Sequence, residues 1–175
     1  MTGKKEMPTM SRSTQDLPKG RGQAVGIDDI SVYVPGLVLP LTGEFSQKRG
    51  IDPGKLVKGI GIEQMAVPDA HEDAATMAAM SLLDLMKRSQ LRPEDIGKIY
   101  VGTESSADEA KSMGTYVIGM LEKVYGRGSF QECSTVEFKA ACIGTTFALE
   151  NLSYWLAVED EGKVGIVIAS DVARY

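Results

Sequence analysis

The sequence predicts an α/β fold in which helices pack on a mainly parallel, partly mixed sheet. Predicted strands alternate with predicted helices along the chain, and this order is typical of a parallel sheet with crossover helices. The segment 163–169 (Lys-Val-Gly-Ile-Val-Ile-Ala) is largely apolar, as are strands buried on both faces of a parallel sheet. With 175 residues, the chain is long enough for one domain with a sizeable core.

The first half of the pattern contains two predicted strands and two short predicted helices. Apolar and polar residues alternate over 24–34, which predicts a strand that Pro35-Gly36 ends. Asp52 is the predicted N-cap of a helix because Pro53 is favoured in the first turn. The predicted elements are a strand at 24–34, helices at 42–49 and 53–59, and a strand at 62–67 that ends before Pro68.

A long amphipathic helix is predicted at 72–89. Its apolar residues recur at steps of three and four positions, which places them on one face of a helix. These residues are Ala75, Ala78, Ala79, Leu82, Leu85 and Met86. Glu72 and Asp73 suit the positive end of the helix dipole, and Lys87 and Arg88 suit its negative end.

The second half continues the alternation of strands and helices. Gly126 and Gly128 end a predicted helix, because glycine is favoured just after the last helical turn. The predicted elements are a turn at 92–95, a strand at 98–103, a helix at 111–124, an extended segment at 130–138, a helix at 145–158 and a strand at 163–169.

Residues 1–23 differ in composition from the remainder. They hold five basic residues and two acidic ones, are rich in Ser, Thr, Gly and Pro, and nearly lack large apolar side chains. Such a segment buries too little surface to offset its chain entropy. We therefore expect a disordered basic tail at 1–23 and a folded domain at 24–175.

Composition and charge argue against several classes of protein. A net charge of −5 disfavours binding to nucleic acid, which needs concentrated Lys and Arg. No apolar run approaches the ~20 residues that cross a bilayer. The two cysteines, Cys133 and Cys142, and the single histidine do not form a zinc-binding pattern. We therefore expect a protein that binds no metal. We also expect a cytoplasmic location, because a reducing compartment suits two free thiols.

Two reactive residue types stand at the ends of predicted elements. Glu104 follows the strand at 98–103, and Cys142 stands where the extended segment 130–138 leads into the helix at 145–158. Ligands gather at the carboxyl ends of parallel strands, so both side chains are expected at one site. Backbone N–H groups at a helix start stabilise a thiolate and can hold an oxyanion during attack on a thioester. The pattern therefore indicates thioester chemistry.

Each of these residues also has a purely structural interpretation. An isolated Cys142 could be a small buried residue, and Cys133 is expected to be one because it lies within an extended segment. Glu104 taken alone could be an exposed loop acid. His71 lies in an acidic turn before the long helix, where we expect a surface or capping residue and not a catalytic one.

Taken together, the chain from about Gly26 to Tyr175 resembles the amino-terminal half of a 3-hydroxy-3-methylglutaryl-CoA synthase, a member of the thiolase-like superfamily. The pieces that carry the resemblance keep the order and spacing of that family. They are Gly26-Ile27, Tyr33-Val34-Pro35, Ile51-Asp52-Pro53-Gly54-Lys55, Gly59-Ile60-Gly61, Glu72-Asp73, Val101-Gly102-Thr103-Glu104-Ser105, Lys111-Ser112, Ala141-Cys142 and Ala169-Ser170-Asp171-Val172-Ala173-Arg174-Tyr175.

The resemblance implies roles for two residues. Cys142 matches the cysteine that acetyl-CoA acetylates, and Glu104 matches the general acid/base that promotes addition of the acetyl group to acetoacetyl-CoA. It also implies a thiolase-like half-fold, a tunnel for CoA, CoA thioesters as substrates without a cofactor, and a dimer. It does not assign the residues that would bind CoA. Ile143 departs from the family, which commonly has an aromatic residue after the nucleophile.

The family builds its fold from two similar halves, and its catalytic histidine lies in the half that has no counterpart here. His71 does not match that histidine. The chain is therefore expected to be a fragment of a synthase or the subunit of a split synthase whose second chain supplies the histidine, in a homo-oligomer of the pair. Two other functions stay open: a synthase of polyketide β-branching that acts on carrier-protein thioesters, and a non-catalytic scaffold half.

Overall fold

A computed structural model of the chain describes residues 24–158 and 162–172. The predicted basic tail at 1–23 lies outside the described residues. The elements, in chain order, are β1 (Leu37–Pro40), α1 (Glu44–Arg49), the π-helix η2 (Lys55–Ile60), β2 (Gln64–Val67), α2 (Ala74–Arg88), the 3₁₀ turn η3 (Pro93–Asp95), β3 (Ile96–Gly102), α3 (Met113–Tyr125), β4 (Ser134–Phe138), α4 (Gly144–Val158) and β5 (Val164–Ala169).

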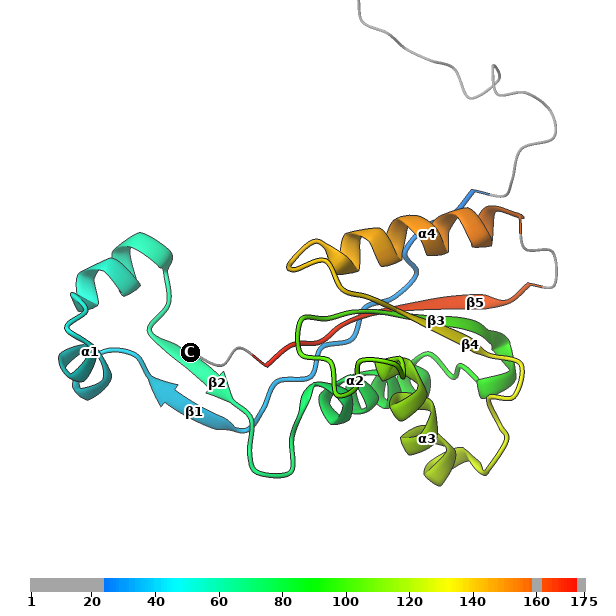
Figure 1. The fold of residues 1–175 in the computed structure, drawn as a ribbon, viewed down its shortest axis with the longest axis horizontal. Helices are drawn as coiled ribbons and strands as arrows, with labels where there is room; N and C mark the ends of the chain where they lie inside the picture. Colours follow the sequence, from blue (N-terminus) through cyan, green and yellow to red (C-terminus); the bar gives the residue numbers. More distant parts are fainter. Residues whose placement is uncertain (1–23, 159–161, 173–175) are drawn as a thin grey trace, which may run out of the picture.

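The centre of the fold is a parallel sheet between two layers of helices. Its strand order is β4-β3-β5, and β3 is parallel to both neighbours. Helices α2 and α3 lie on one face of this sheet, and α4 lies on the other (Figure 1). The prediction of an α/β fold with a mainly parallel sheet is confirmed, and the separate antiparallel pair of β1 and β2 makes the strand content mixed.

The core lies between the sheet and the layer of α2 and α3. Ile99 and Val101 of β3 are fully buried, as are Met113 and Val117 of α3. Small side chains of α2, such as Ala78, let that helix pack closely against its neighbours. β3 is therefore the central strand, and its carboxyl end is held firmly on both sides.

Helix α2 begins and ends close to the predicted bounds. Asp73 is its N-cap: the Asp73 carboxylate accepts a hydrogen bond from Thr76 N at 2.7 Å, and the Thr76 hydroxyl accepts one from Asp73 N at 2.7 Å. This capping box satisfies backbone donors that a helix start leaves unpaired. Glu72 therefore lies just outside the helix, where the sequence pattern had included it.

The predicted strand at 24–34 is wrong. Residues 24–34 have no strand partner among the described residues and instead lie along α2. Asp29 accepts hydrogen bonds from Arg88 at 3.1 Å and Ser89 at 2.6 Å, and Ser31 donates to Asp84 at 2.8 Å. An alternating pattern favours extended backbone, but a strand also requires a neighbouring strand to pair with.

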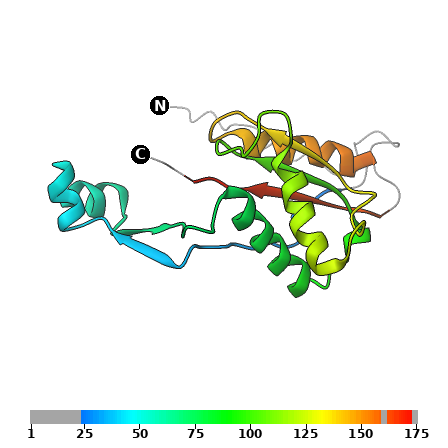
Figure 2. The same cartoon turned by 60° about the horizontal axis from the view of Figure 1, so that its bottom comes forward.

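The predicted strand at 62–67 is observed as β2, whereas its partner β1 was missed by the sequence pattern. β1 pairs with β2 in an antiparallel hairpin that reaches away from the main sheet and carries α1 and η2 at its tip (Figures 1 and 2). Leu37 and Val38 of β1 are exposed. The predicted helix at 53–59 is observed: the helical backbone begins at Pro53 and continues as the π-helix Lys55–Ile60, with Asp52 accepting a hydrogen bond from Gly54 N at 2.9 Å.

The remaining predictions differ from the structure mainly at element ends. Residues 130–132 form turns, so β4 begins at Ser134 and not at Phe130. The Phe130 side chain is buried in the core next to Tyr125, which holds this stretch as a turn against α3. In the described part of the chain, no helix is long and apolar enough to cross a membrane.

Candidate active site

Glu104 lies in the loop that follows β3, and Asp171 holds the backbone of this loop. One Asp171 carboxylate oxygen accepts hydrogen bonds from Thr103 Oγ1 at 2.9 Å, Glu104 N at 2.6 Å and Ser105 N at 3.1 Å. Bonds to a carboxylate are charge-assisted and stronger than those between neutral groups. Because Asp171 lies two positions after the last residue of β5, it ties the end of β5 to the end of β3. Glu104 itself is exposed.

Cys142 lies in the turn between β4 and α4, where the backbone takes an unusual conformation. Ala141 has φ +47°, in the left-handed region that residues with a Cβ rarely adopt. Ile143 N donates to Ala140 O at 3.2 Å and Gly144 N donates to Ala141 O at 3.1 Å, which closes the turn. Strained backbone of this kind is concentrated at functional sites. The turn leaves the Cys142 side chain exposed.

The helix that follows Cys142 begins one residue earlier than predicted. The sequence pattern predicted it from residue 145, and α4 begins at Gly144, so the thiol precedes the first helical residue by two positions. The N–H groups of Ile143 and Gly144 are engaged by the turn carbonyls. These two groups are therefore not free to hold an oxyanion as the sequence analysis had expected of the N–H groups that follow the thiol.

Two glycines let the turn that contains Cys142 approach the end of β3. A Cβ added to Gly102 would lie 2.3 Å from Thr145 N, and one added to Gly144 would lie 2.6 Å from Phe138 O. Real Cβ atoms do not approach other atoms so closely, so a side chain at either position would push α4 away from the sheet. The glycines thereby set the distance between the segments that carry Glu104 and Cys142.

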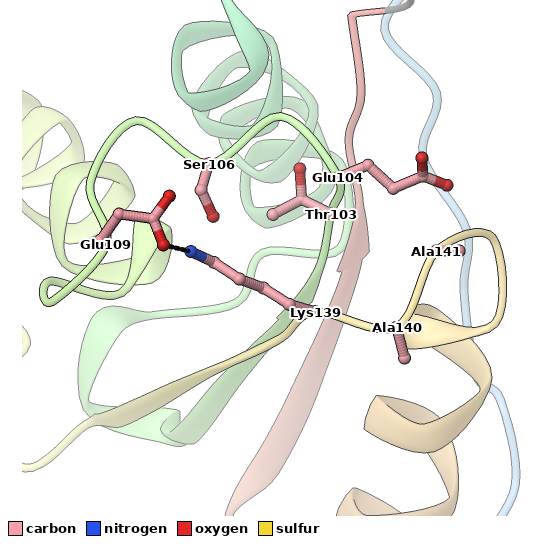
Figure 3. A pocket seen from close by; sticks show the side chains of 7 residues that line it. All are labelled: Thr103, Glu104, Ser106, Glu109, Lys139, Ala140 and Ala141. Atoms are coloured by element: carbon pink, nitrogen blue, oxygen red, sulfur yellow. Dashed lines mark hydrogen bonds and ion pairs between the residues drawn. The ribbon is translucent and has the colours of Figure 1, made fainter.

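The structure brings Glu104 and Cys142 together. The Cys142 thiol lies 3.4 Å from Glu104 Oε1, within the range for a hydrogen bond from sulfur. Figure 3 shows the Glu104 side chain pointing away from Lys139 and toward the turn that contains Ala141. A thiol beside a carboxylate can provide a nucleophile together with a group that accepts or donates a proton.

A polar pocket of about 320 Å³ lies beside this pair (Figure 3). Lys139 crosses it, and its ammonium lies 2.8 Å from Glu109 Oε2. The hydrogen bond and charge of Glu109 raise the pKa of Lys139, so this lysine stays protonated. The lining residues are Thr103, Glu104, Ser106, Glu109, Lys139, Ala140 and Ala141.

The other two candidate residues lie elsewhere. The His71 side chain is 79% exposed, lies 3.8 Å from Asp69 and lines a separate apolar pocket beside α2 and α3. Cys133 is partly buried, and burial raises the pKa of its thiol to about 11. Neither residue lines the pocket beside Glu104. No group of three potential metal ligands is present in residues 24–158 and 162–172.

Sequence reasoning missed two acidic residues that support the site. Asp171 and Glu137 both stand at the carboxyl end of a strand, next to the loop that carries Glu104. The available signal was their position: Glu137 lies near the end of the predicted extended segment 130–138, and Asp171 follows the predicted strand at 163–169. The hydrogen bonds that the two residues make connect segments far apart in sequence, and no local pattern encodes such bonds.

Comparison with known proteins identifies close relatives. A family described as "Hydroxymethylglutaryl-coenzyme A synthase N terminal" matches residues 21–175. The hydroxymethylglutaryl-CoA synthase of Haloferax volcanii is 41% identical over 153 residues, which is 87% of this chain and 34% of that protein. The hydroxymethylglutaryl-CoA synthase of Enterococcus faecalis is 35% identical over 151 residues, 86% of this chain and 37% of that protein. The chain thus spans about a third of the length of these relatives.

Solved structures of similar proteins share the fold. MvaS in complex with 3-hydroxy-3-methylglutaryl coenzyme A superposes with a TM-score of 0.77 and 33% identity, over 89% of this chain and 35% of that one. The HMG synthase of the curacin biosynthetic pathway, in complex with a holo donor-ACP, superposes with a TM-score of 0.71 and 27% identity. It matches 86% of this chain and 35% of its own.

Proposed function

Because the chain belongs to the hydroxymethylglutaryl-CoA synthase family, we propose that it provides the nucleophile and the acid/base of such a synthase. The substrates are acetyl-CoA and acetoacetyl-CoA, and the intermediate is an acetyl-cysteine on Cys142. One observation carries the proposal: Cys142 Sγ lies 3.4 Å from Glu104 Oε1 at the carboxyl ends of two adjacent parallel strands.

The reaction follows from the chemistry of the two side chains. The Cys142 sulfur loses its proton and attacks the acetyl carbonyl; the bond between that carbonyl and the CoA sulfur breaks, and CoA leaves as the thiol. Glu104 takes a proton from the acetyl methyl group, and the resulting carbanion adds to the ketone carbon of acetoacetyl-CoA. The ketone oxygen receives that proton back from Glu104 and becomes the product hydroxyl. Water then cleaves the bond between the enzyme sulfur and the product. CoA thioesters are substrates here, and no cofactor takes part.

A complementary carboxyl-terminal half is part of this proposal. The chain spans about a third of the relatives' length, and its single histidine, His71, is exposed in another pocket. Helix α4 packs Ala148 and Leu152 on the sheet, but its exposed surface also carries large apolar side chains among polar ones. The exposed large apolar residues of α4 are Phe147, Leu149, Tyr154 and Val158, and Ile143 just before the helix is exposed as well. Exposed apolar side chains of this number suit a helix with a partner beyond it.

We propose that this second half supplies the catalytic histidine and that the pair assembles as a homo-oligomer. The exposed side of α4 supports the association because a large exposed apolar patch is unfavourable in water. A role in the mevalonate pathway and a cytoplasmic location complete the proposal. The free thiols of Cys133 and Cys142 are consistent with a reducing compartment.

A second candidate is a synthase that acts on carrier-protein thioesters in polyketide β-branching. The similarity to the curacin pathway HMG synthase, solved with a donor-ACP, favours this alternative. Both enzymes would acetylate Cys142, so the acyl donor distinguishes them: acetyl-CoA for the first and acetylated carrier protein for the second. A non-catalytic scaffold half would accept acetyl groups from neither donor.

The decisive experiment measures acetylation of the protein by intact mass and peptide mapping. The chain is incubated with acetyl-CoA or with acetylated carrier protein, alone and together with a complementary half. We expect one acetyl group on Cys142, lost in Cys142→Ala and kept in the matched control Cys133→Ala. An adduct only with the second half present would establish a split site. The absence of an adduct under every condition would leave the scaffold as the function.

A further inference from the structure

Glu137 carries a buried carboxylate beside the candidate active site. Its side chain is only 7% exposed, although it lies near the end of β4 and close to the polar pocket. One carboxylate oxygen accepts a hydrogen bond from the Ser106 hydroxyl, and the other accepts one from Met113 N at 2.7 Å. Lys139 Nζ lies 3.9 Å from the first oxygen. Burying a carboxylate is costly unless such partners compensate for lost water.

These partners come from three different segments. Glu137 belongs to β4, five residues before Cys142; Ser106 lies two residues after Glu104; and Met113 is the first residue of α3. The Met113 N–H belongs to the positive end of the α3 dipole, which favours a nearby anion. The carboxylate therefore fastens the loop 103–112 at Ser106, and the start of α3 at Met113, to the strand that leads into the turn of Cys142.

We propose that Glu137 is a positioning residue that keeps Glu104 directed at Cys142 during the proposed condensation, an inference that rests on the proposed function. Asp171 fixes the first part of the loop at Thr103, Glu104 and Ser105. Glu137 fixes the later part at Ser106 and Met113.

Other bonds also join the loop 103–112 to β4 and the residue after it: Thr103 N donates to Phe138 O at 3.3 Å, Ser112 Oγ lies 3.3 Å from Thr135 Oγ1, and Lys139 pairs with Glu109 at 2.8 Å. Glu137 differs from these because its buried carboxylate holds Ser106, two residues after Glu104, and the start of α3 at the same time. Glu104 follows β3 and Cys142 follows β4, so this attachment supports the distance between them.

The test compares Glu137→Met with Glu137→Gln in the assembled synthase. Met fills similar volume but accepts no hydrogen bond, whereas Gln can still accept from Met113 N–H and donate to Ser106. We expect Glu137→Met to slow condensation by about tenfold or more, since small misplacements of reacting groups are costly, and to change the rate of Cys142 acetylation by less than about twofold. Glu137→Gln should recover most of the rate. Ser106→Ala, which removes one bond only, gives an intermediate loss and serves if Glu137→Met does not fold.

Two controls separate positioning from general stability. Glu132→Met changes an exposed acid at the opposite end of β4, where it pairs with Lys163 at 2.9 Å, and should leave both steps unchanged. In the background of Glu104→Gln, Glu137→Met should cause no further loss of condensation, because residues that act through one another are non-additive. An additive loss, or equal losses in acetylation and condensation, would overturn the proposal.

Failure of the proposed function has a different result. If the unaltered protein gains no acetyl group, the synthase assignment fails and the catalytic part of this inference fails with it. Amide hydrogen exchange then still decides whether Glu137 holds the loop. We expect exchange at 103–113 to speed by about tenfold in Glu137→Met and not in Glu132→Met. Unchanged exchange together with unchanged condensation would show that Glu137 positions nothing.

Discussion

The thiol of Cys142 and the carboxylate of Glu104 lie 3.4 Å apart although 38 positions separate them in the sequence. They meet because β3 and β4 are adjacent parallel strands, paired through Gly102 and Phe138 at their last residues. Each side chain then follows its strand by only a few positions. The pair is thus a consequence of strand order, strengthened by the close packing of Gly102 against α4.

Replacement of Cys142 by alanine should abolish acetylation without unfolding the protein. The side chain is exposed, so its removal should change the free energy of unfolding by less than about 0.5 kcal/mol. Urea denaturation and intact mass measure the two effects. An acetyl group that persists in Cys142→Ala would mean that another residue is the nucleophile.

Replacement of Glu104 by alanine should separate the two chemical steps. If Glu104 is the general acid/base, turnover should fall by ~10²–10⁴-fold, while transfer of the acetyl group to Cys142 stays largely intact. Single-turnover acetylation and steady-state condensation, measured in the assembled enzyme, give the two rates. A loss of turnover below about tenfold would contradict the assigned role.

A side chain at Gly102 should weaken both the fold and the site. The Cβ of Gly102→Ala would lie 2.3 Å from Thr145 N, so α4 must shift, at a cost of about 1–3 kcal/mol in the free energy of unfolding. Gly119→Ala is the matched control, since nothing lies within 4 Å of its added Cβ in α3. The control should gain about 0.5–1 kcal/mol from helix propensity. Equal stability of the two variants in urea would contradict the close packing.

Cys133 and Cys142 should differ in their reaction with iodoacetamide. Burial raises the pKa of Cys133 to about 11, so at pH 8 only on the order of a thousandth of this thiol is the reactive thiolate. Its alkylation rate should rise about tenfold per pH unit from pH 8 to 10 and level off near pH 11. Peptide mapping after timed alkylation measures both sites. Faster alkylation of Cys133 than of the exposed Cys142 at pH 8 would be the contrary result.

A charge on the outer side of α4 should prevent association with the complementary half. Tyr154 is 66% exposed, so Tyr154→Lys should leave the fold of this chain intact while placing a charge in a buried interface, which is costly. Val124→Lys on α3, 57% exposed and on the opposite face of the sheet, is the control. Size-exclusion chromatography with light scattering should show the complex for the control and its loss for Tyr154→Lys.

The sequence pattern predicted most elements because each has a local cause. α2 has its apolar spacing and its Asp73 cap, and β5 has its apolar run, so both lie within two residues of the predicted bounds. The segment 24–34 was predicted as a strand and has no strand partner among the described residues. A strand forms only where a neighbouring strand can pair with it. The local alternation of apolar and polar residues predicts neither the lack of a partner for 24–34 nor the pairing of β1 with β2.

The sequence by itself determined the α/β class, the residue types at the site and the family, through motifs that keep their order and spacing. The sequence also predicted that Glu104 and Cys142 share one site and that His71 does not belong to it. Only the tertiary structure showed that the Cys142 thiol contacts the Glu104 carboxylate and that Asp171 and Glu137 hold the loop 103–112. The physical reason is the separation in sequence over which each interaction acts. Helix caps and apolar periodicity act over a few residues, whereas these contacts join segments more than 20 positions apart and exist only once parallel strands have paired.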